Sequence, residues 1–441
     1  MIDLLQLEGV CPCGHRADND HLLIIANADV AVPDRCPACN NPQVYKHGKR
    51  LYQYADTPMH GKPVIVEIER QRYRCKSCGS VITPTIPSLD DKRIATRRLV
   101  EYVQGNCFNN TFTHLAKETG LVVNTIKGIT LDYAEWLEKH LQRETPRLMG
   151  LDEVKIAGDY RAVITNLEMR TVFDIHENRT VAKLKFFFKN LKNKKNVEWV
   201  AADMWEPYKV LLDRYLPDAQ RVIDRFHVVR MASDALEKIR IDLQKLIPKE
   251  DRIHMKKNIR WALLRGNKSR TDKDWAIVEH IRQNYPQLAL AFDLKEEFFQ
   301  IYESNNRTEG EQAFEKWKNS IPPEFKNTNL KHDYGEVVET VDRHHQDIFN
   351  YFDCPITNGY TEATNGVMKV ANRMGRGYTY EIIRAKMLYS KIPLQAGKVV
   401  MHKANVTGIE QPVSTLGVKS EVNYGSYIPT LDELTERDEI N

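Results

Sequence analysis

The chain has 441 residues, of which 42% are hydrophobic and 28% are charged, and its net charge is +4. This length excludes a single small domain and predicts roughly three units of ordinary size, with enough apolar residues to build real cores. The total charge identifies no partner, but residues 43–98 hold twelve Lys or Arg against five Asp or Glu. That local excess favours a polyanionic partner over an ordinary solvated surface.

The amino terminus and the cysteine content indicate the compartment. Residues 1–10 lack the cationic stretch and long apolar core of a secretory signal, and no apolar run approaches the length needed to cross a bilayer. Four of the eight cysteines form two Cys-x-x-Cys pairs, which suit metal binding in a reducing compartment better than disulfides. We therefore expect a soluble cytoplasmic protein with no membrane partner.

The two Cys-x-x-Cys pairs predict a zinc-binding domain over residues 1–85. Cys36 and Cys39 are separated from Cys75 and Cys78 by a stretch that has the pattern of β-strands. Two such pairs joined by strands form a four-thiolate site with tetrahedral geometry for Zn²⁺. A further pair, Cys11-x-Cys13, has an unusual spacing, and whether it binds metal stays open.

Residues 86–145 are helical in pattern and predict a helix-turn-helix DNA-binding domain. Ala116 lets two helices approach closely, Gly120 permits the turn, and Ile126 packs the second helix back onto the first. The alternative is a helical hairpin inside an unrelated domain. In the DNA-binding interpretation, the recognition helix begins near Val123, and its DNA-contacting residues are Asn124, Thr125 and Lys127.

From residue 146 to 234, strands and helices alternate. Three strands, a helix, a strand, a helix, a strand and a helix follow in that order, which is the order of a ribonuclease H-like domain. Asp152 ends the apolar run 148–151 on the first strand, and Asp203 ends the run 197–202 on the fourth. In that fold both carboxylates face one cleft.

The residues after 234 predict an insertion within this catalytic domain. Residues 235–350 have apolar positions three and four apart and are expected to form an all-helical insertion, with Trp261, Trp275 and Trp317 filling its core rather than stacking on bases. Residues 351–396 complete the ribonuclease H-like domain, and residues 397–441 form a C-terminal tail. The predicted fold class is thus a multidomain chain of mixed α+β and α/β type.

A predicted helix over residues 361–374 supplies a third acid. Glu362, Asn365, Lys369 and Arg373 recur three or four residues apart, so one side of the helix carries an acid at its start and bases toward its end. An exposed amphipathic helix is the alternative. Beside Asp152 and Asp203 the pattern favours a metal ligand next to DNA-contacting side chains, and Arg376 adds a base in the glycine-flanked turn that follows.

Three acids on two strands and a helix predict a site for divalent cations. Two Mg²⁺ (or Mn²⁺) ions held by Asp152, Asp203 and Glu362 can activate a water or a 3′ hydroxyl and stabilise the leaving oxygen of a phosphodiester. Asp224 and His227, three residues apart at a strand-to-helix junction, form an accessory pair. Asp224 could replace Asp203 as the second metal ligand, the pair could handle the flanking DNA strand, or it could be a structural cap.

Over nearly its full length the chain resembles the ISL3 family of bacterial insertion-sequence transposases. The resemblance rests on the ordered set of the two Cys-x-x-Cys pairs, residues 116–126, Leu151-Asp152-Glu153, Asp203-Met204 with Tyr208, residues 224–228 and residues 358–369. It implies a DDE transposase with Asp152, Asp203 and Glu362 as its triad, which binds the terminal inverted repeats of its element and target DNA as double strands. It also implies a homodimer or larger assembly, acting at the bacterial nucleoid.

Two other functions remain compatible with these patterns. One is a DNA-binding regulator derived from a transposase with an inactive catalytic centre, although intact carboxylates at all three positions argue against it. The other is a ribonuclease H-like nuclease that does not transpose, such as a junction resolvase, which does not need a module that reads terminal repeats.

Overall fold

The computed structural model describes residues 5–17, 20–178, 180–246, 252, 259–326 and 333–390, so the expected tail 397–441 lies outside the described residues. Contacts within the chain group these residues into two compact units. The first unit contains residues 5–143 together with residues 370–390, and the second contains residues 144–369.

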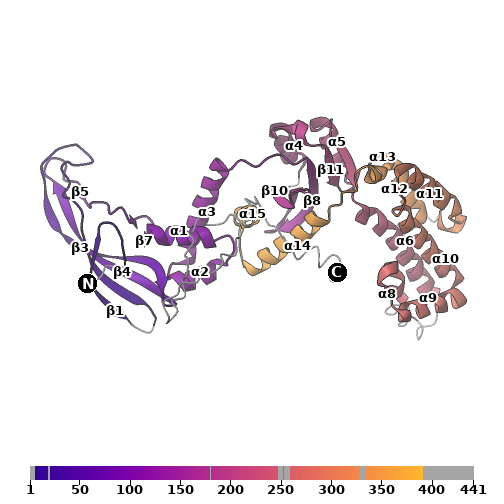
Figure 1. Cartoon of the computed structure of the whole chain (residues 1–441), viewed down its shortest axis with the longest axis horizontal. Helices are drawn as coiled ribbons and strands as arrows, with labels where there is room; N and C mark the ends of the chain where they lie inside the picture. Colours follow the sequence, from indigo (N-terminus) through magenta and orange to yellow (C-terminus); the bar gives the residue numbers. More distant parts are fainter. Residues whose placement is uncertain are drawn as a thin grey trace, which may run out of the picture. The chain divides into compact units, whose positions relative to one another are not determined.

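A seven-stranded sheet forms the amino-terminal part of the first unit, drawn in indigo in Figure 1. Its strands are β1 (Val10–Ala17), β2 (Leu22–Ala28), β3 (Val44–Met59), β4 (Lys62–Cys75), β5 (Val81–Ile82), β6 (Leu89–Asp90) and β7 (Ala95–Thr96). The long hairpin β3–β4 is antiparallel, and alternate side chains of β4, Val64, Val66 and Ile68, are buried in one core with Tyr54. This period of two is the pattern of a strand with one buried face.

Three helices follow the sheet in the same unit: α1 (Arg97–Asn106), α2 (Phe112–Thr119) and α3 (Val123–His140). Gly120 ends α2 with a φ of 75°, a left-handed conformation that glycine adopts without a steric penalty. Leu115 of α2 and Ile126 of α3 are fully buried. The structure therefore has two helices joined by a tight turn at the residues where the sequence predicted them.

A fourth helix of the first unit, α15 (Tyr380–Tyr389), comes from the far end of the described chain. The Lys386 ammonium donates to the carbonyl oxygens of Cys107, Phe108 and Asn110, at 2.6, 3.2 and 2.8 Å. These bonds satisfy carbonyls just after α1, although burial lowers the pKa of Lys386 to about 8. Residues 370–390 therefore group with the α1–α3 helices, whereas the sequence assigned them to the last part of the catalytic domain.

The second unit is built on a five-stranded sheet with the order β10-β9-β8-β11-β12. The strands are β8 (Leu148–Ile156), β9 (Asp159–Asn166), β10 (Thr171–His176), β11 (Trp199–Ala202) and β12 (Gln220–Ile223). The first three pair antiparallel, while β11 lies parallel to both β8 and β12. Figure 1 shows α4 (Val181–Asn190) and α5 (Glu206–Tyr215) beside this sheet, and their side chains share its apolar core with Met149 and Leu151.

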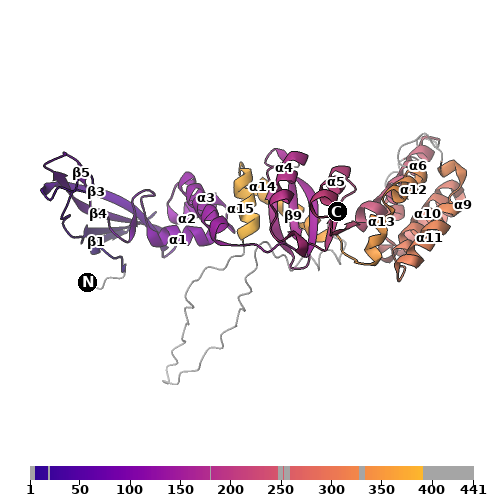
Figure 2. The same cartoon turned by 90° about the horizontal axis from the view of Figure 1, so that it is seen from above.

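Between β12 and α14 (Gly359–Met374), the described residues of the second unit are helical and contain no strand. The main helices, which gather in one bundle in Figures 1 and 2, are α6 (Arg225–Leu246), α8 (Arg260–Leu264), α9 (Asp272–Asn284), α10 (Pro286–Ile301), α11 (Arg307–Ser320), α12 (Tyr334–Arg343) and α13 (His345–Phe349). Trp317 is buried in this bundle as expected, but Trp261 and Trp275 are 51% and 42% exposed, so the expectation of core positions was wrong for these two. Within the described residues, no helix is both long and apolar enough to span a membrane.

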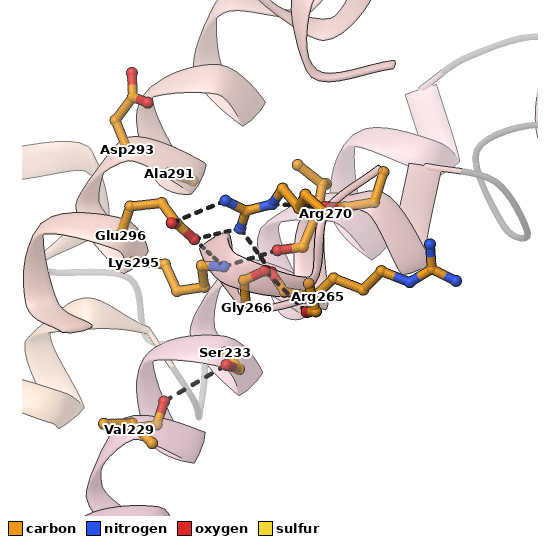
Figure 3. A network of polar contacts seen from close by, with 12 residues as sticks. Val229, Ser233, Arg265, Gly266, Arg270, Ala291, Asp293, Lys295 and Glu296 are labelled. Carbon is orange, nitrogen blue, oxygen red and sulfur yellow. Dashed lines mark hydrogen bonds and ion pairs between the residues drawn. The ribbon is translucent and has the colours of Figure 1, made fainter. Parts of the chain in front are cut away.

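A buried ionic network holds the turn after α8 against α10 (Figure 3). Lys295 is fully buried and donates to the Leu263 carbonyl oxygen at 2.8 Å. Arg270 binds Glu296 through both terminal nitrogens, at 2.9 and 2.5 Å, and also donates to the Arg265 carbonyl oxygen at 2.7 Å. Buried charges are tolerated only when they are paired and hydrogen-bonded, and both Lys295 and Arg270 have such acceptors here.

Candidate active site

The four cysteines of the two Cys-x-x-Cys pairs meet in the first unit, at the end of the β3–β4 hairpin. The Sγ atoms of Cys36 and Cys78 are 3.6 Å apart, as are those of Cys39 and Cys75, and all four lie within 4.8 Å of one another. A tetrahedron with metal–sulfur bonds of about 2.3 Å has edges of about 3.8 Å, so the cluster has the dimensions of a zinc site. Hydrogen bonding to Ser80 lowers the pKa of Cys78 to about 6, whereas hydrogen bonds with the other thiols raise the pKa of Cys39, so zinc would displace protons from the cluster.

Cys11 and Cys13 lie exposed on β1, and neither belongs to a cluster of metal-ligating side chains among the described residues. The Cys13 thiol contacts the Ile25 carbonyl oxygen at 3.4 Å instead.

In the second unit, strand pairing brings three aspartates to one level of the sheet. Parallel pairing matches Ala202 of β11 with Leu151 of β8 and with Ile223 of β12. The next residue after each of these three positions is an aspartate: Asp152, Asp203 and Asp224. Asp203 and Asp224 directly follow the carboxyl ends of β11 and β12, and the register places Asp152, in the middle of β8, level with them.

The beginnings of two helices complete the cluster. His227 lies in the first turn of α6, and Glu362 lies in the first turn of α14. The His227 Nδ1 atom is 3.8 Å from the Asp203 Oδ1 atom, and its Nε2 atom is 3.6 Å from the Glu362 Oε1 atom. Ligand atoms of Asp224, His227 and Glu362 lie within 4.8 Å of one another.

The crowding of acids shows in their pKa values. Burial and the neighbouring carboxylates of Asp224 and Asp152 raise the pKa of Glu362 to about 7, against the opposing effect of His227. Burial is also the main reason why the pKa values of Asp152 and Asp224 are raised. Several partly buried carboxylates at one place repel each other, so the site favours either protons or a cation.

This donor set fits divalent cations. Carboxylate oxygens are the ligands that Mg²⁺ and Mn²⁺ prefer, and a cation would offset the repulsion that raises these pKa values. In addition, the His227 Nε2 atom is buried and has no hydrogen-bond partner among the described residues. Asp224 differs from the others because its two oxygens accept from the backbone nitrogens of Phe226 and Asn358, at 3.2 and 3.1 Å. Asp224 therefore also caps the start of α6, which is one of the roles that the sequence left open for it.

The residues predicted to contact DNA have different surroundings. In the first unit, Asn124, Lys127 and Arg376 line one cavity of about 500 Å³, whereas Thr125 is half-buried and does not line it. Lys369 and Arg373 are exposed on α14. Asn365 is only 5% exposed, and its amide donates to the Asp152 carboxylate at 2.8 Å.

Sequence reasoning missed the buried polar residues that connect α14 to the sheet. They are Thr165, Asn358 and Thr361, and Gly150 of β8 leaves the space in which their side chains meet. A signal was available, because Asn358, Thr361 and Asn365 recur three and four residues apart, at the start of the same polar stretch that contains Glu362.

The raised pKa of Glu362 predicts how the metal-free protein responds to pH. The native pKa is about 7 and the ordinary value is 4.5, so the native state retains a proton that the unfolded chain releases. Stability from this group is fully present below pH 4.5 and is lost as pH rises through about 7. Glu362→Gln keeps a neutral side chain at every pH, so the unfolding temperature of wild type should fall relative to this variant between pH 5 and 8.

The measurement is thermal unfolding in EDTA across that range, with the exposed Glu339→Gln as a control that should follow wild type. Parallel curves for wild type and Glu362→Gln would contradict the prediction.

Comparisons with known proteins agree with this geometry. The family model of ISL3-type DDE transposases, described as "Transposase", matches residues 149–387, and the model described as "zinc-finger of transposase IS204/IS1001/IS1096/IS1165" matches residues 33–78. The transposase for insertion sequence element IS1001 of Bordetella parapertussis is 23% identical over 292 residues, covering 64% of this chain and 71% of the relative. The transposase for insertion sequence element IS1557 of Mycobacterium tuberculosis is 23% identical over 387 residues, covering 79% of this chain and 83% of the relative.

The first family model covers more than half of the chain and includes every acid of the cluster, and the second covers all four clustered cysteines. The resemblance drawn from the sequence motifs is therefore confirmed: the chain belongs to the ISL3 family of insertion-sequence transposases.

Proposed function

We propose that this transposase cuts and joins DNA at the acid cluster of the second unit, with Asp152, Asp203 and Glu362 as the metal-binding triad. The observation that carries the proposal is the register of three parallel strands, which sets Asp152 of β8 level with Asp203 and Asp224 just after β11 and β12, together with Glu362 in the first turn of α14. The strand order β10-β9-β8-β11-β12, with antiparallel β8–β10 and parallel β11 and β12, supports the interpretation of this sheet as ribonuclease H-like.

In this proposal the acidic side chains of the cluster would hold the divalent cations and give the site its negative charge. When bound, Mg²⁺ or Mn²⁺ would supply activation of the attacking oxygen and charge neutralisation at the leaving 3′ oxygen. Asp152 and Asp203 present carboxylates from rigid strands, and Glu362 approaches from α14. The imidazole of His227 lies between the Asp203 and Glu362 carboxylates, with a nitrogen within 4 Å of each. Asp224 remains the alternative to Asp203 as the second ligand.

We infer that the first unit binds double-stranded DNA, using the cavity lined by residues 111–113, 123, 124 and 127 and residues 374–378 with Ile382. Lys127 and Arg376 are its charged lining residues, and no acid lines it. Arg376 has a φ of 42°, a left-handed conformation that is strained for a residue with a side chain and that occurs often at functional sites. The positive lining supports contact with a phosphate backbone, and the α2–α3 pair supports a helix-turn-helix.

The proposed substrates are the terminal inverted repeats of the element and its target DNA, with action at the bacterial nucleoid. Because two ends must be joined together, we propose a homodimer or larger assembly. A regulator without catalytic activity would bind the repeats without cutting them, so the experiments below separate the two functions.

Removing the central acid should abolish cleavage and spare DNA binding. Charge stabilisation at a metal site is worth several kcal/mol, so Asp152→Ala should slow strand cleavage more than about 100-fold. The measurement is cleavage of a labelled repeat-end duplex with Mg²⁺, together with its binding in EDTA. The exposed Asp213→Ala should cut like wild type. Equal cleavage by Asp152→Ala and wild type would refute the site, and comparing Asp203→Ala with Asp224→Ala identifies the second ligand.

The cysteine cluster should hold one Zn²⁺ per chain. Native mass spectrometry of the purified protein should show that ion, and Cys75→Ser should lose it because three thiolates bind zinc less tightly than four. Cys107→Ser is the matched control, since Cys107 is buried away from the cluster. Zinc-free native protein, or equal zinc content in the Cys75→Ser variant, would disprove this prediction.

If Lys127 and Arg376 contact phosphates, replacing either with Ala should weaken DNA binding at every sequence and reduce the salt slope of binding by about one. The measurement is the affinity for a repeat-end duplex over a series of salt concentrations. Lys139→Ala is the control, because Lys139 lies on α3 about three turns beyond Lys127 and pairs with Glu135. An unchanged salt slope in both cavity variants would exclude this surface.

A further inference from the structure

A layer of buried polar side chains joins the first turns of α14 to the sheet in the second unit. Asn358 donates to the Leu151 carbonyl oxygen at 3.0 Å, and its side-chain oxygen accepts from the Thr361 hydroxyl at 2.6 Å. The Thr361 hydroxyl also lies 2.7 Å from that of Thr165 on β9. All three side chains are fully buried. Satisfied hydrogen bonds in a water-free interface specify one geometry more strictly than apolar packing does.

Gly150 makes this close approach possible. A Cβ atom at that position would lie 2.4 Å from the Thr165 hydroxyl oxygen, 2.5 Å from that of Thr361 and 2.7 Å from the Asn358 side-chain oxygen. No side chain fits in that space, so only glycine lets α14 come this near to β8. The interface therefore sets the position of α14 on the sheet two residues away from Asp152.

Asn365, one turn further along α14, extends the layer to the Asp152 carboxylate. Its amide nitrogen lies 2.8 Å from the Asp152 Oδ2 atom and 3.3 Å from the Glu153 carbonyl oxygen. The other carboxylate oxygen, Oδ1, accepts from the Glu153 backbone nitrogen at 2.7 Å. Each oxygen of Asp152 thus has one fixed donor and retains a lone pair for a further ligand.

We propose that Asn365 is a positioning residue that orients the Asp152 carboxylate for a divalent cation, instead of the DNA contact that its spacing suggested. Its 5% exposure leaves little surface for a DNA strand, and its donor group is already directed at Asp152. Hydrogen bonds of this kind fix the orientation of a metal ligand and thereby set metal affinity. The inference rests on the proposed function in one respect, that Asp152 binds metal.

The test measures metal and DNA binding separately. Asn365→Leu keeps the size of the side chain and removes its donor, so Mn²⁺ affinity in the absence of DNA should fall about 10- to 100-fold, the usual effect of losing a group that orients a ligand. Mn²⁺ affinity can be measured by calorimetric titration or by the electron paramagnetic resonance of free Mn²⁺. Affinity for a repeat-end duplex in EDTA should stay at the wild-type level.

Thr364→Val is the matched control, because Thr364 is equally buried on α14 but its hydroxyl donates to the Tyr360 carbonyl oxygen and not to an acid. Asn365→Ser, whose short side chain cannot reach Asp152, is the second variant and should show the same loss of Mn²⁺ affinity.

Three outcomes would overturn the inference: wild-type Mn²⁺ affinity in a folded Asn365 variant, weakened DNA binding with unchanged Mn²⁺ affinity, or unfolding of both variants in EDTA while Thr364→Val stays folded. The last would assign Asn365 to stability alone. If wild type itself binds no Mn²⁺, or if Asp152→Ala binds it normally, the proposed metal site fails, and that result is distinct from a failure of Asn365 alone.

Discussion

Parallel pairing of β11 with both of its neighbours is the constraint on which the acid cluster depends. Backbone hydrogen bonds fix the register Leu151–Ala202–Ile223, and the next residue on each strand is an aspartate. A shift of one residue in either pairing would move an aspartate to the other face of the sheet, into the apolar core around Met149 and Leu151. The cost of burying an unpaired carboxylate there protects the register, so the acids help to select the pairing that gathers them.

The two faces of this sheet are stabilised differently. On one face, α4 and α5 cover apolar side chains, where volume and burial matter most. On the other, α14 is joined through hydrogen bonds among Thr165, Asn358 and Thr361. Apolar packing tolerates small shifts with little change in energy, whereas hydrogen bonds are directional. The hydrogen-bonded face is the one on which α14 places Glu362, and metal chemistry requires that the position of this carboxylate be held closely.

Much of the architecture could be predicted from local patterns. The two Cys-x-x-Cys pairs, the glycine between two helices and the alternation of strands and helices each report on a short segment, and the structure has these elements at the expected residues. The acids could be located for the same reason, since Asp152 follows an apolar run within its strand, Asp203 and Asp224 follow strands, and Glu362 lies in the first turn of a helix.

The sequence could not show which elements cover each side of a helix. Asn365 and Lys369 share a helical spacing with Glu362, yet Asn365 is buried against Asp152 while Lys369 is exposed. Similarly, Trp261, Trp275 and Trp317 all lie in helices, and only Trp317 enters the core. Periodicity identifies a side of a helix but not what covers it. The grouping of α15 with α1 depends on the hydrogen bonds of Lys386 to carbonyl oxygens more than 270 residues earlier. A pattern read over a short segment of the sequence cannot predict such a distant contact.

The path of α14 has a consequence for truncated forms of the protein. The helix begins in the second unit and ends in the first, and α15 follows it there. A fragment that stops after residue 143 keeps α3 but loses α15, and with it Arg384. Although burial alone would raise the pKa of Glu138, Arg384 and Arg143 hold it at about 2 in the intact chain. Among the described residues the first unit is therefore not one continuous stretch of the sequence, and producing it alone requires a linker that joins residue 143 to residue 370 in place of the second unit.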